Sequence, residues 1–239
     1  MSQSEFDASD TQSAPLQKPG HYSIRGVALD MDGLLFDTEG LYWEVGNEVL
    51  QRRGHCFSKE LQQRMMGRVG VSALQQMVDF HSLDDSPETL LAESDELFSA
   101  KLELGVPPMA GVNEWIELLI RADIPFGLAT SSRRKFVDVL FQSIPWRNDL
   151  AFILTGDDVT RGKPDPQIYS LAAGRLAISP GQMLVLEDSG NGCAAAVTAG
   201  AYTVAIPSVH TQDQDFHGAK LVADTISDPR LHALIQEQS

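Results

Sequence analysis

Short apolar runs alternate along this chain with longer stretches in which apolar and polar positions mix. Each short run is almost continuously apolar and ends at polar residues or glycine, which predicts a buried strand. Strands are expected at residues 25–31, 125–129, 151–154, 183–186, 202–206 and 221–223. Buried strands that alternate with helices predict a parallel sheet with both faces covered. The expected fold class is therefore α/β, with a Rossmann-like parallel sheet as its core.

The longer stretches repeat their apolar residues at the spacing of a helix that buries one face. Helices are expected over residues 39–53, 73–81, 87–104, 166–176, 193–199 and 229–236, with two more around 112–120 and 136–144. The clearest apolar face, at 112–120, consists of Val112, Trp115, Ile116, Leu119 and Ile120. We expect this helix to cover the sheet as the crossover that leads into the second strand.

The distance between the first two predicted strands indicates an insertion. About ninety residues separate them, whereas a crossover between parallel strands needs only about a dozen. Helical patterns fill the excess. We therefore expect residues 38–107 to form a small helical insert, and residues 21–37 and 108–239 to form the α/β core. Residues 1–20 are polar and are expected to be a disordered tail.

Composition narrows the classes of partner. The chain has 239 residues and a formal net charge of −15, which argues against a nucleic-acid scaffold. Its one basic cluster, Arg133-Arg134-Lys135, is expected in the first turn of a helix. No apolar run reaches the roughly 18 residues of a membrane span, and we expect no secretory signal. The two cysteines, Cys56 and Cys193, suggest neither a disulfide framework nor a zinc site, so a cytoplasmic protein is expected.

Polar residues gather where three predicted strands end, and a lysine lies in a nearby loop. They are Asp30 and Asp32; Thr130, Ser131 and Ser132; Glu187 and Asp188; and Lys163. Each group alone has an ordinary structural explanation, as a turn, a helix N-cap or a solvated charge. In a parallel sheet, however, the carboxyl ends of the strands meet at one edge, where ligands bind. The groups together therefore predict a functional site.

The residue types indicate phosphoryl transfer. Converging carboxylates with no compensating arginine favour a hard cation, and Mg²⁺ suits oxygen ligands. A hydroxyl, backbone N–H groups at a helix N-terminus and a lysine together form a cradle for an oxyanion. A carboxylate beside such a cradle can act as the nucleophile and form an aspartyl-phosphate. The metal and the lysine would neutralise the transferring group.

In their order along the chain, the motifs resemble those of the haloacid dehalogenase superfamily of phosphatases and phosphomutases. The matching residues are Asp30-Met31-Asp32-Gly33, Thr130, Lys163 and Glu187-Asp188, and the resemblance covers about residues 22–238. Helical patterning directly after the first motif resembles the subclass with an α-helical cap. That subclass includes β-phosphoglucomutase, phosphoglycolate phosphatase and pseudouridine-5′-phosphatase.

The resemblance implies a role for each carboxylate. Asp30 would be the nucleophile and would also contact the metal. Asp32 would be the general acid/base, and its backbone carbonyl would bind Mg²⁺. Asp188 would be a direct metal ligand, with Glu187 as an outer-shell or second carboxylate.

The resemblance also implies which residues hold the phosphate. The side chains of Thr130 and Lys163 would hold the phosphoryl oxygens. Gly33, Ser131 and Ser132 would add backbone or side-chain contacts.

The cap is implied to select the substrate, and its candidates are Glu39, Tyr42, Gly67 and Arg68. The loop at 65–70 resembles the cap loop that reaches into the site in this family. β-Phosphoglucomutases carry an arginine later in that loop, where this chain has Gly70. They also carry a histidine in the first cap helix, where this chain has Tyr42. Both differences favour hydrolysis over the mutase reaction.

The expected activity is a Mg²⁺-dependent phosphatase that hydrolyses small phosphomonoesters, such as sugar or nucleoside phosphates, through an aspartyl-phosphate. Its expected partner is a small phosphorylated metabolite, with no nucleic acid or membrane, and we expect a monomer. One alternative is a phosphomutase, which passes the phosphoryl group to a second hydroxyl. The other is a catalytically idle binding module that keeps the fold.

Overall fold

The computed structural model describes residues 23–65, 68 and 70–236, so the tail predicted at 1–20 lies outside the described residues. Its centre is a six-stranded parallel sheet in the order β3-β2-β1-β4-β5-β6. The strands are β1 (Gly26–Leu29), β2 (Phe126–Ala129), β3 (Phe152–Leu154), β4 (Met183–Glu187), β5 (Tyr202–Ala205) and β6 (Leu221–Val222). The α/β fold class and its parallel sheet are therefore confirmed.

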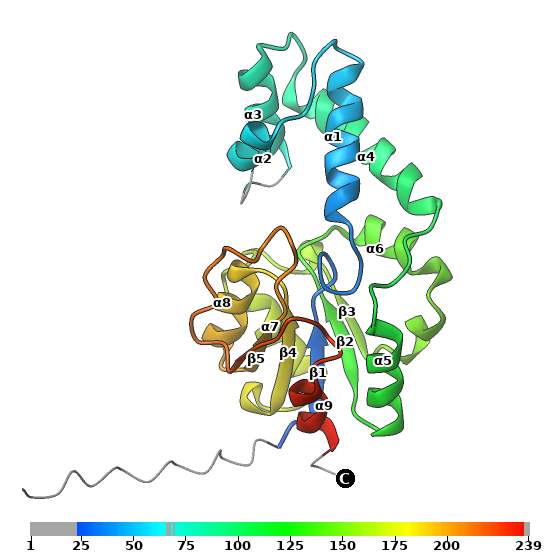
Figure 1. Ribbon diagram of the computed structural model, residues 1–239, viewed down its shortest axis with the longest axis vertical. Helices are drawn as coiled ribbons and strands as arrows, with labels where there is room; N and C mark the ends of the chain where they lie inside the picture. The colour runs from blue at the N-terminus through cyan, green and yellow to red at the C-terminus, as the bar shows by residue number, and fades with distance from the viewer. Residues whose placement is uncertain (1–22, 66–67, 69, 237–239) are drawn as a thin grey trace, which may run out of the picture.

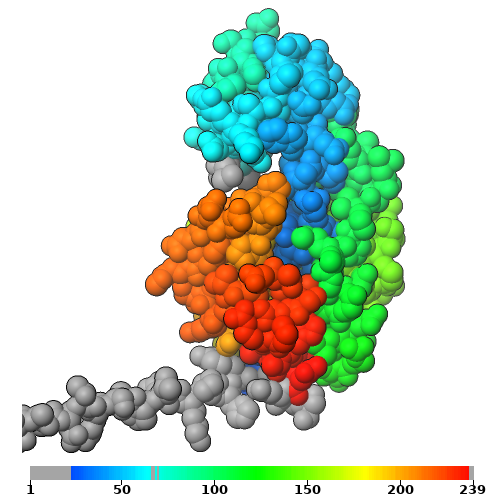
Figure 2. All heavy atoms as spheres, viewed as in Figure 1, coloured from blue at the N-terminus to red at the C-terminus, as the bar shows by residue number. Residues whose placement is uncertain are grey.

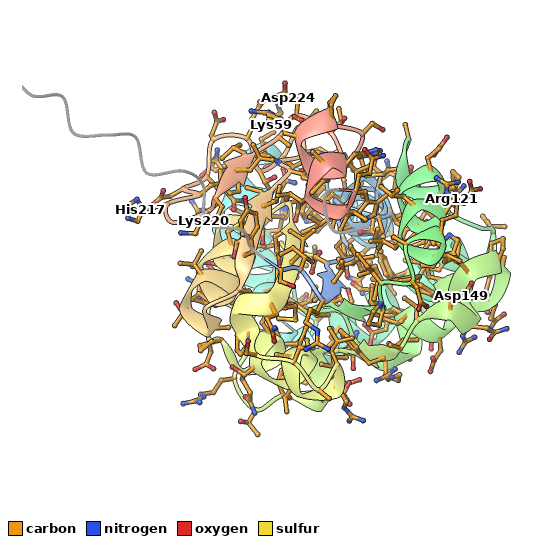
Figure 3. All side chains as sticks on the ribbon, turned by 90° about the horizontal axis from the view of Figure 1, so that it is seen from below. Lys59, Arg121, Asp149, His217, Lys220 and Asp224 are labelled. Carbon is orange, nitrogen blue, oxygen red and sulfur yellow. The ribbon has the colours of Figure 1, made fainter. Side chains whose placement is uncertain are left out.

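Helices cover both faces of the sheet because alternate strand residues point to opposite sides. Val27 and Leu29 belong to an apolar cluster with α5 (Val112–Arg121), α6 (Arg134–Leu140) and α9 (Pro229–Gln236). Ala28 belongs to a second cluster, with α7 (Gln167–Arg175) and α8 (Gly190–Ala199). Seen from below, the labelled charged side chains of Arg121, Asp149 and Lys220 point outward from the rim of this core (Figure 3).

Four helices between β1 and α5 form a separate lobe, which we call the helical lobe (Figure 1). They are α1 (Glu39–Gln51), α2 (Lys59–Met65), α3 (Val71–His81) and α4 (Pro87–Glu103). The lobe stands over the carboxyl ends of the strands, and the surface is hollowed between it and the core (Figure 2). The inserted helical segment predicted after the first strand is thus present.

The two connections between the lobe and the core lie side by side. Phe36 and Pro108 form an isolated antiparallel bridge, and the Met109 N–H donates to the Leu35 carbonyl at 2.8 Å. A second contact joins the two parts further out, where the rings of Phe98 on α4 and Phe136 on α6 meet edge to face at 4.8 Å. The helical lobe is therefore held to the core along one side.

Three details differ from the sequence prediction. Helix α2 was missed because Leu61 is its one buried residue, so no periodic face marks it. Ile120 was assigned to the buried face of α5 but is 46% exposed, because it lies at the end of the helix. The helix expected around 136–144 ends at Leu140, and two 3₁₀ turns follow it.

Short 3₁₀ segments complete the core. They are η1 (Phe141–Ser143), η2 (Pro145–Asp149), η3 (Gly156–Asp158) and η4 (Pro180–Gln182). Within the described ranges, no helix combines the length and apolarity needed to span a bilayer.

Candidate active site

The predicted strand-end residues come together at the carboxyl edge of the sheet. Asp30 directly follows β1, Thr130 follows β2, and Glu187 is the last residue of β4. Because β1 pairs with both β2 and β4, these three residues lie on adjacent strands. All three are buried. The sheet therefore builds the site directly beneath the helical lobe.

Lys163 links all three of these strands through its ammonium group. Its Nζ donates to Asp30 Oδ1 at 2.5 Å, to Glu187 Oε1 at 2.6 Å and to the Ala129 carbonyl at 2.9 Å. The lysine side chain is only 6% exposed. Burial lowers the pKa of Lys163, but the carboxylates of Asp30 and Glu187 outweigh burial and raise that pKa above its usual range. The lysine is therefore held as a buried cation against Asp30.

Glu187 is held entirely by protein donors. Besides Lys163, its oxygens accept from the Tyr169 hydroxyl at 2.7 Å, the Ser189 N–H at 3.1 Å and the Ser189 hydroxyl at 3.0 Å. A methyl group at Gly192 would collide with this carboxylate, so α8 approaches it closely only because a glycine stands there. Glu187 is thus fixed in position, and it fixes Lys163.

Asp32 has different surroundings from Asp30. Its Oδ1 accepts from the Thr38 hydroxyl at 2.5 Å. Its Oδ2 accepts from the Ser132 hydroxyl at 2.7 Å and the Thr130 hydroxyl at 3.1 Å. Two carboxylates two residues apart, one against a cation and one among hydroxyls, have environments suited to two different chemical roles.

Asp30, Glu187 and Asp188 form the acidic cluster of the site. One oxygen from each lies within 4.8 Å of the others. Burial, followed by the charges of Glu187 and Asp32, raises the pKa of Asp30 to about 8 even though Lys163 lowers it. Burial together with Asp30 and Glu187 raises the pKa of Asp188 to about 9.

These oxygens suit a hard divalent cation. Burial is the main cause of the raised pKa values of Asp30 and Asp188, the neighbouring carboxylates add to it, and a bound cation would lower both pKa values. Gly33 adds a steric condition. It has a φ of +76°, and a side chain there would collide with the Asp188 carboxylate. The residues present therefore fit a Mg²⁺ site.

The remaining phosphate-contact candidates differ in exposure. Ser132 is buried, and its N–H donates to the Thr130 hydroxyl at 3.0 Å. Ser131 is exposed. The Gly33 N–H donates to the Phe36 carbonyl at 2.9 Å, which closes the turn after Asp32.

The specificity candidates on the helical lobe are dispersed. Glu39 Oε2 lies 3.4 Å from His210 Nδ1, and burial raises the pKa of Glu39. The Tyr42 ring stacks on Phe98 at 4.3 Å. Arg68 is exposed, and its Nε donates to the Arg64 carbonyl at 3.1 Å. Gly67 lies outside the described residues.

Three residues of the site were not predicted from the sequence. Thr38 contacts Asp32, Tyr169 contacts Glu187, and the Thr211 hydroxyl lies 3.4 Å from Asp188 Oδ2. Tyr169 sits on the ordinary buried face of α7, and Thr211 lies far along the chain, so neither stands out by spacing. Thr38 was open to inference, because it follows the first motif directly.

Comparison with known sequences gives a consistent result. The profile of the haloacid dehalogenase-like hydrolase family matches residues 27–206. The phosphorylated carbohydrates phosphatase of Thermotoga maritima is 33% identical over 74% of this chain and 82% of its own length. The (DL)-glycerol-3-phosphatase 2 of Arabidopsis thaliana is 33% identical over 79% of this chain and 81% of its own length. This chain spans about half (54%) of the bifunctional riboflavin kinase/FMN phosphatase of A. thaliana, at 29% identity.

Solved structures share this fold over most of the chain. CbbY from Rhodobacter sphaeroides, in complex with xylulose-(1,5)bisphosphate, superposes with a TM-score of 0.76 at 27% identity, covering 86% of this chain and 96% of CbbY. A putative β-phosphoglucomutase from T. maritima gives a TM-score of 0.73 at 27% identity, covering 90% of this chain and 98% of that protein.

Proposed function

The chain belongs to the haloacid dehalogenase-like hydrolases, in the subclass with a helical cap, and we propose that it hydrolyses small phosphomonoesters through an aspartyl-phosphate on Asp30. It is a phosphatase of phosphorylated small molecules. We further propose sugar or nucleoside phosphates as the substrate class. Support for sugars comes from the phosphorylated carbohydrates phosphatase and the bisphosphate-bound CbbY. Support for nucleosides comes from the probable pseudouridine-5′-phosphatase of Drosophila melanogaster, 31% identical over 84% of this chain.

The contact between Asp30 and Lys163 is the observation that carries the mechanism. A carboxylate nucleophile attacks phosphorus only where the negative charge of the phosphoryl oxygens is offset, and a buried ammonium at 2.5 Å provides that offset. Glu187 and Tyr169 keep the ammonium in place. Asp30 then forms the bond to phosphorus, and the ester oxygen leaves.

Asp32 is the proposed general acid/base. The hydroxyls of Thr38 and Ser132 hold its carboxyl group in one orientation beside Asp30. It would give a proton to the leaving alcohol and then take one from the water that attacks the aspartyl-phosphate. Thr130 and Lys163 would hold the phosphoryl oxygens during both steps.

Asp30, the Asp32 carbonyl and Asp188 are the proposed ligands of Mg²⁺, with Glu187 beside them as the group that orients Lys163. When bound, the metal would neutralise charge on the transferring phosphoryl group. We also propose that residues 38–107, which include the helical lobe, act as a cap that excludes bulk water, over a core of residues 21–37 and 108–239.

Phosphate release from a panel of sugar and nucleoside monophosphates tests this function. We expect release with Mg²⁺, and a fall of at least about 100-fold with a chelator, because the cation supplies transition-state charge stabilisation. No release from any ester would contradict the proposal. So would isomerisation of a hexose 1-phosphate, with little free phosphate, when a trace of hexose bisphosphate is added.

A further inference from the structure

One carboxylate of the helical lobe holds two cations of the core. Asp95, on α4, forms an ion pair with Arg133 through Oδ1, and its Oδ2 accepts from Lys135 Nζ at 2.7 Å. The Asp95 side chain is 16% exposed, whereas those of Arg133 and Lys135 are 39% and 48% exposed. Both oxygens of Asp95 are therefore engaged, each by one partly exposed cation.

This cluster borders the active site. Arg133 directly follows Ser132, whose hydroxyl contacts Asp32. Tyr42 connects the two regions. Its ring stacks at 4.3 Å on Phe98, which lies three residues after Asp95 on α4. Besides burial, which raises the pKa of its phenol most, the charges of Asp32 and Arg133 both act on that pKa, Asp32 raising it and Arg133 lowering it. The Tyr42 hydroxyl therefore lies within electrostatic range of both the proposed acid/base and the Arg133–Asp95 pair.

The two cations are also held in place by an aromatic ring. Arg133 Cζ and Lys135 Nζ each lie 4.8 Å from the centroid of the Phe136 ring. Cation–π contacts of this kind keep a charge near a surface without neutralising it. Asp95 is the group that neutralises part of their charge, and it comes from the lobe that stands over the carboxyl ends of the strands.

We propose that Asp95 determines substrate specificity by pairing with Arg133 and Lys135. The site then selects monophosphate esters over bisphosphates, which carry a second phosphate at the end away from the reacting one. This inference rests on the proposed function. Without Asp95, two cations at the rim would be free for a second dianion. With Asp95 in place, a second dianion meets a carboxylate of like charge and must compete with it, which lowers affinity.

Calorimetric binding of glucose 6-phosphate and glucose 1,6-bisphosphate tests the proposal without requiring turnover. Both ligands are titrated, with Mg²⁺ present, into the Asp30→Asn protein and into the same protein carrying Asp95→Asn. We expect the second change to shift the ratio of the two Kd values about tenfold toward the bisphosphate, an effect that falls with added salt. If the wild-type protein released no phosphate from any ester, the proposed phosphatase function would be refuted, but the ratio of the two Kd values could still be measured.

Two further variants distinguish the effect of the Asp95 charge from a structural effect of the substitution. Asp95→Glu keeps the negative charge, and we expect it to keep the original ratio. Asp138→Asn removes the same charge from α6, where Asp138 pairs with Arg147 at 3.5 Å, and should also leave the ratio unchanged. An Asp95→Asn protein that binds both ligands in the original ratio, or more weakly by the same factor, would overturn the proposal.

Discussion

Replacing Asp30 with asparagine is expected to lower the rate of phosphate release at least about 1,000-fold, because an amide cannot replace a carboxylate as the nucleophile. The substitution keeps the shape of the side chain. The fold should persist, since Lys163 retains Glu187 and the Ala129 carbonyl as acceptors. Steady-state kinetics on the best ester of the panel, together with circular dichroism, measures both effects.

Asp37→Asn is the matched control for Asp30→Asn. Asp37 lies in the same connection after β1 and is exposed, and the hydrogen bond its side chain makes, from the Gly40 N–H, is long at 3.5 Å. The change in charge is the same, and we expect less than a twofold change in rate. If Asp30→Asn kept most of the activity, the nucleophile would have to be another group.

Replacing Lys163 with alanine should damage both activity and stability. The substitution leaves Asp30 and Glu187 buried with no cation between them. Removing one partner of a buried ion pair costs about 3–5 kcal/mol of unfolding free energy. The loss should be larger at pH 9 than at pH 6. With Lys163 present the pKa of Asp30 is about 8, so at pH 6 Asp30 is mostly protonated in both proteins. Above pH 8 it ionises beside the lysine in the wild type, whereas without the lysine its ionisation is less favourable.

Urea unfolding of the Lys163→Ala protein at the two pH values measures this effect, without added metal. Lys220→Ala is the control, because Lys220 is exposed on the rim of the core (Figure 3). We expect its unfolding free energy to change by less than about 0.5 kcal/mol. An Lys163→Ala protein as stable as the wild type at pH 9 would show that the lysine does not balance these carboxylates.

The sequence was sufficient to predict the fold because its signals are local. Near-continuous apolar runs such as Val27-Ala28-Leu29 mark buried parallel strands. Helix α2 carries a single buried residue, Leu61, and was missed because periodicity needs several. Ile120 has the correct spacing for the buried face of α5, but the helix ends one residue later and leaves its side chain exposed.

The site was predictable to the extent that topology brings strand ends together. Asp30, Thr130 and Glu187 end strands that prove to be neighbours, and the edge where they meet follows from the parallel sheet. The spacing of residues along the sequence does not show which side chain contacts each of these groups. Tyr169 reaches Glu187 from a helix whose pattern is that of any buried helix. Asp95 reaches Arg133 across the space between lobe and core, and no local signal marks such a contact.

The identity of the phosphorylated residue tests the central claim most directly. The Asp32→Asn protein lacks the group that would protonate the leaving alcohol and then activate water, so Asp30 should still be phosphorylated, more slowly, and the intermediate should persist. It is mixed with the best ester and Mg²⁺, quenched in acid and digested for mass spectrometry. We predict the mass of one phosphoryl group on the peptide that contains Asp30, and its loss after treatment with hydroxylamine, as expected of an acyl phosphate. A phosphoryl group on another residue, or phosphate release with no labelled peptide at any time, would contradict the assignment of Asp30 as the nucleophile.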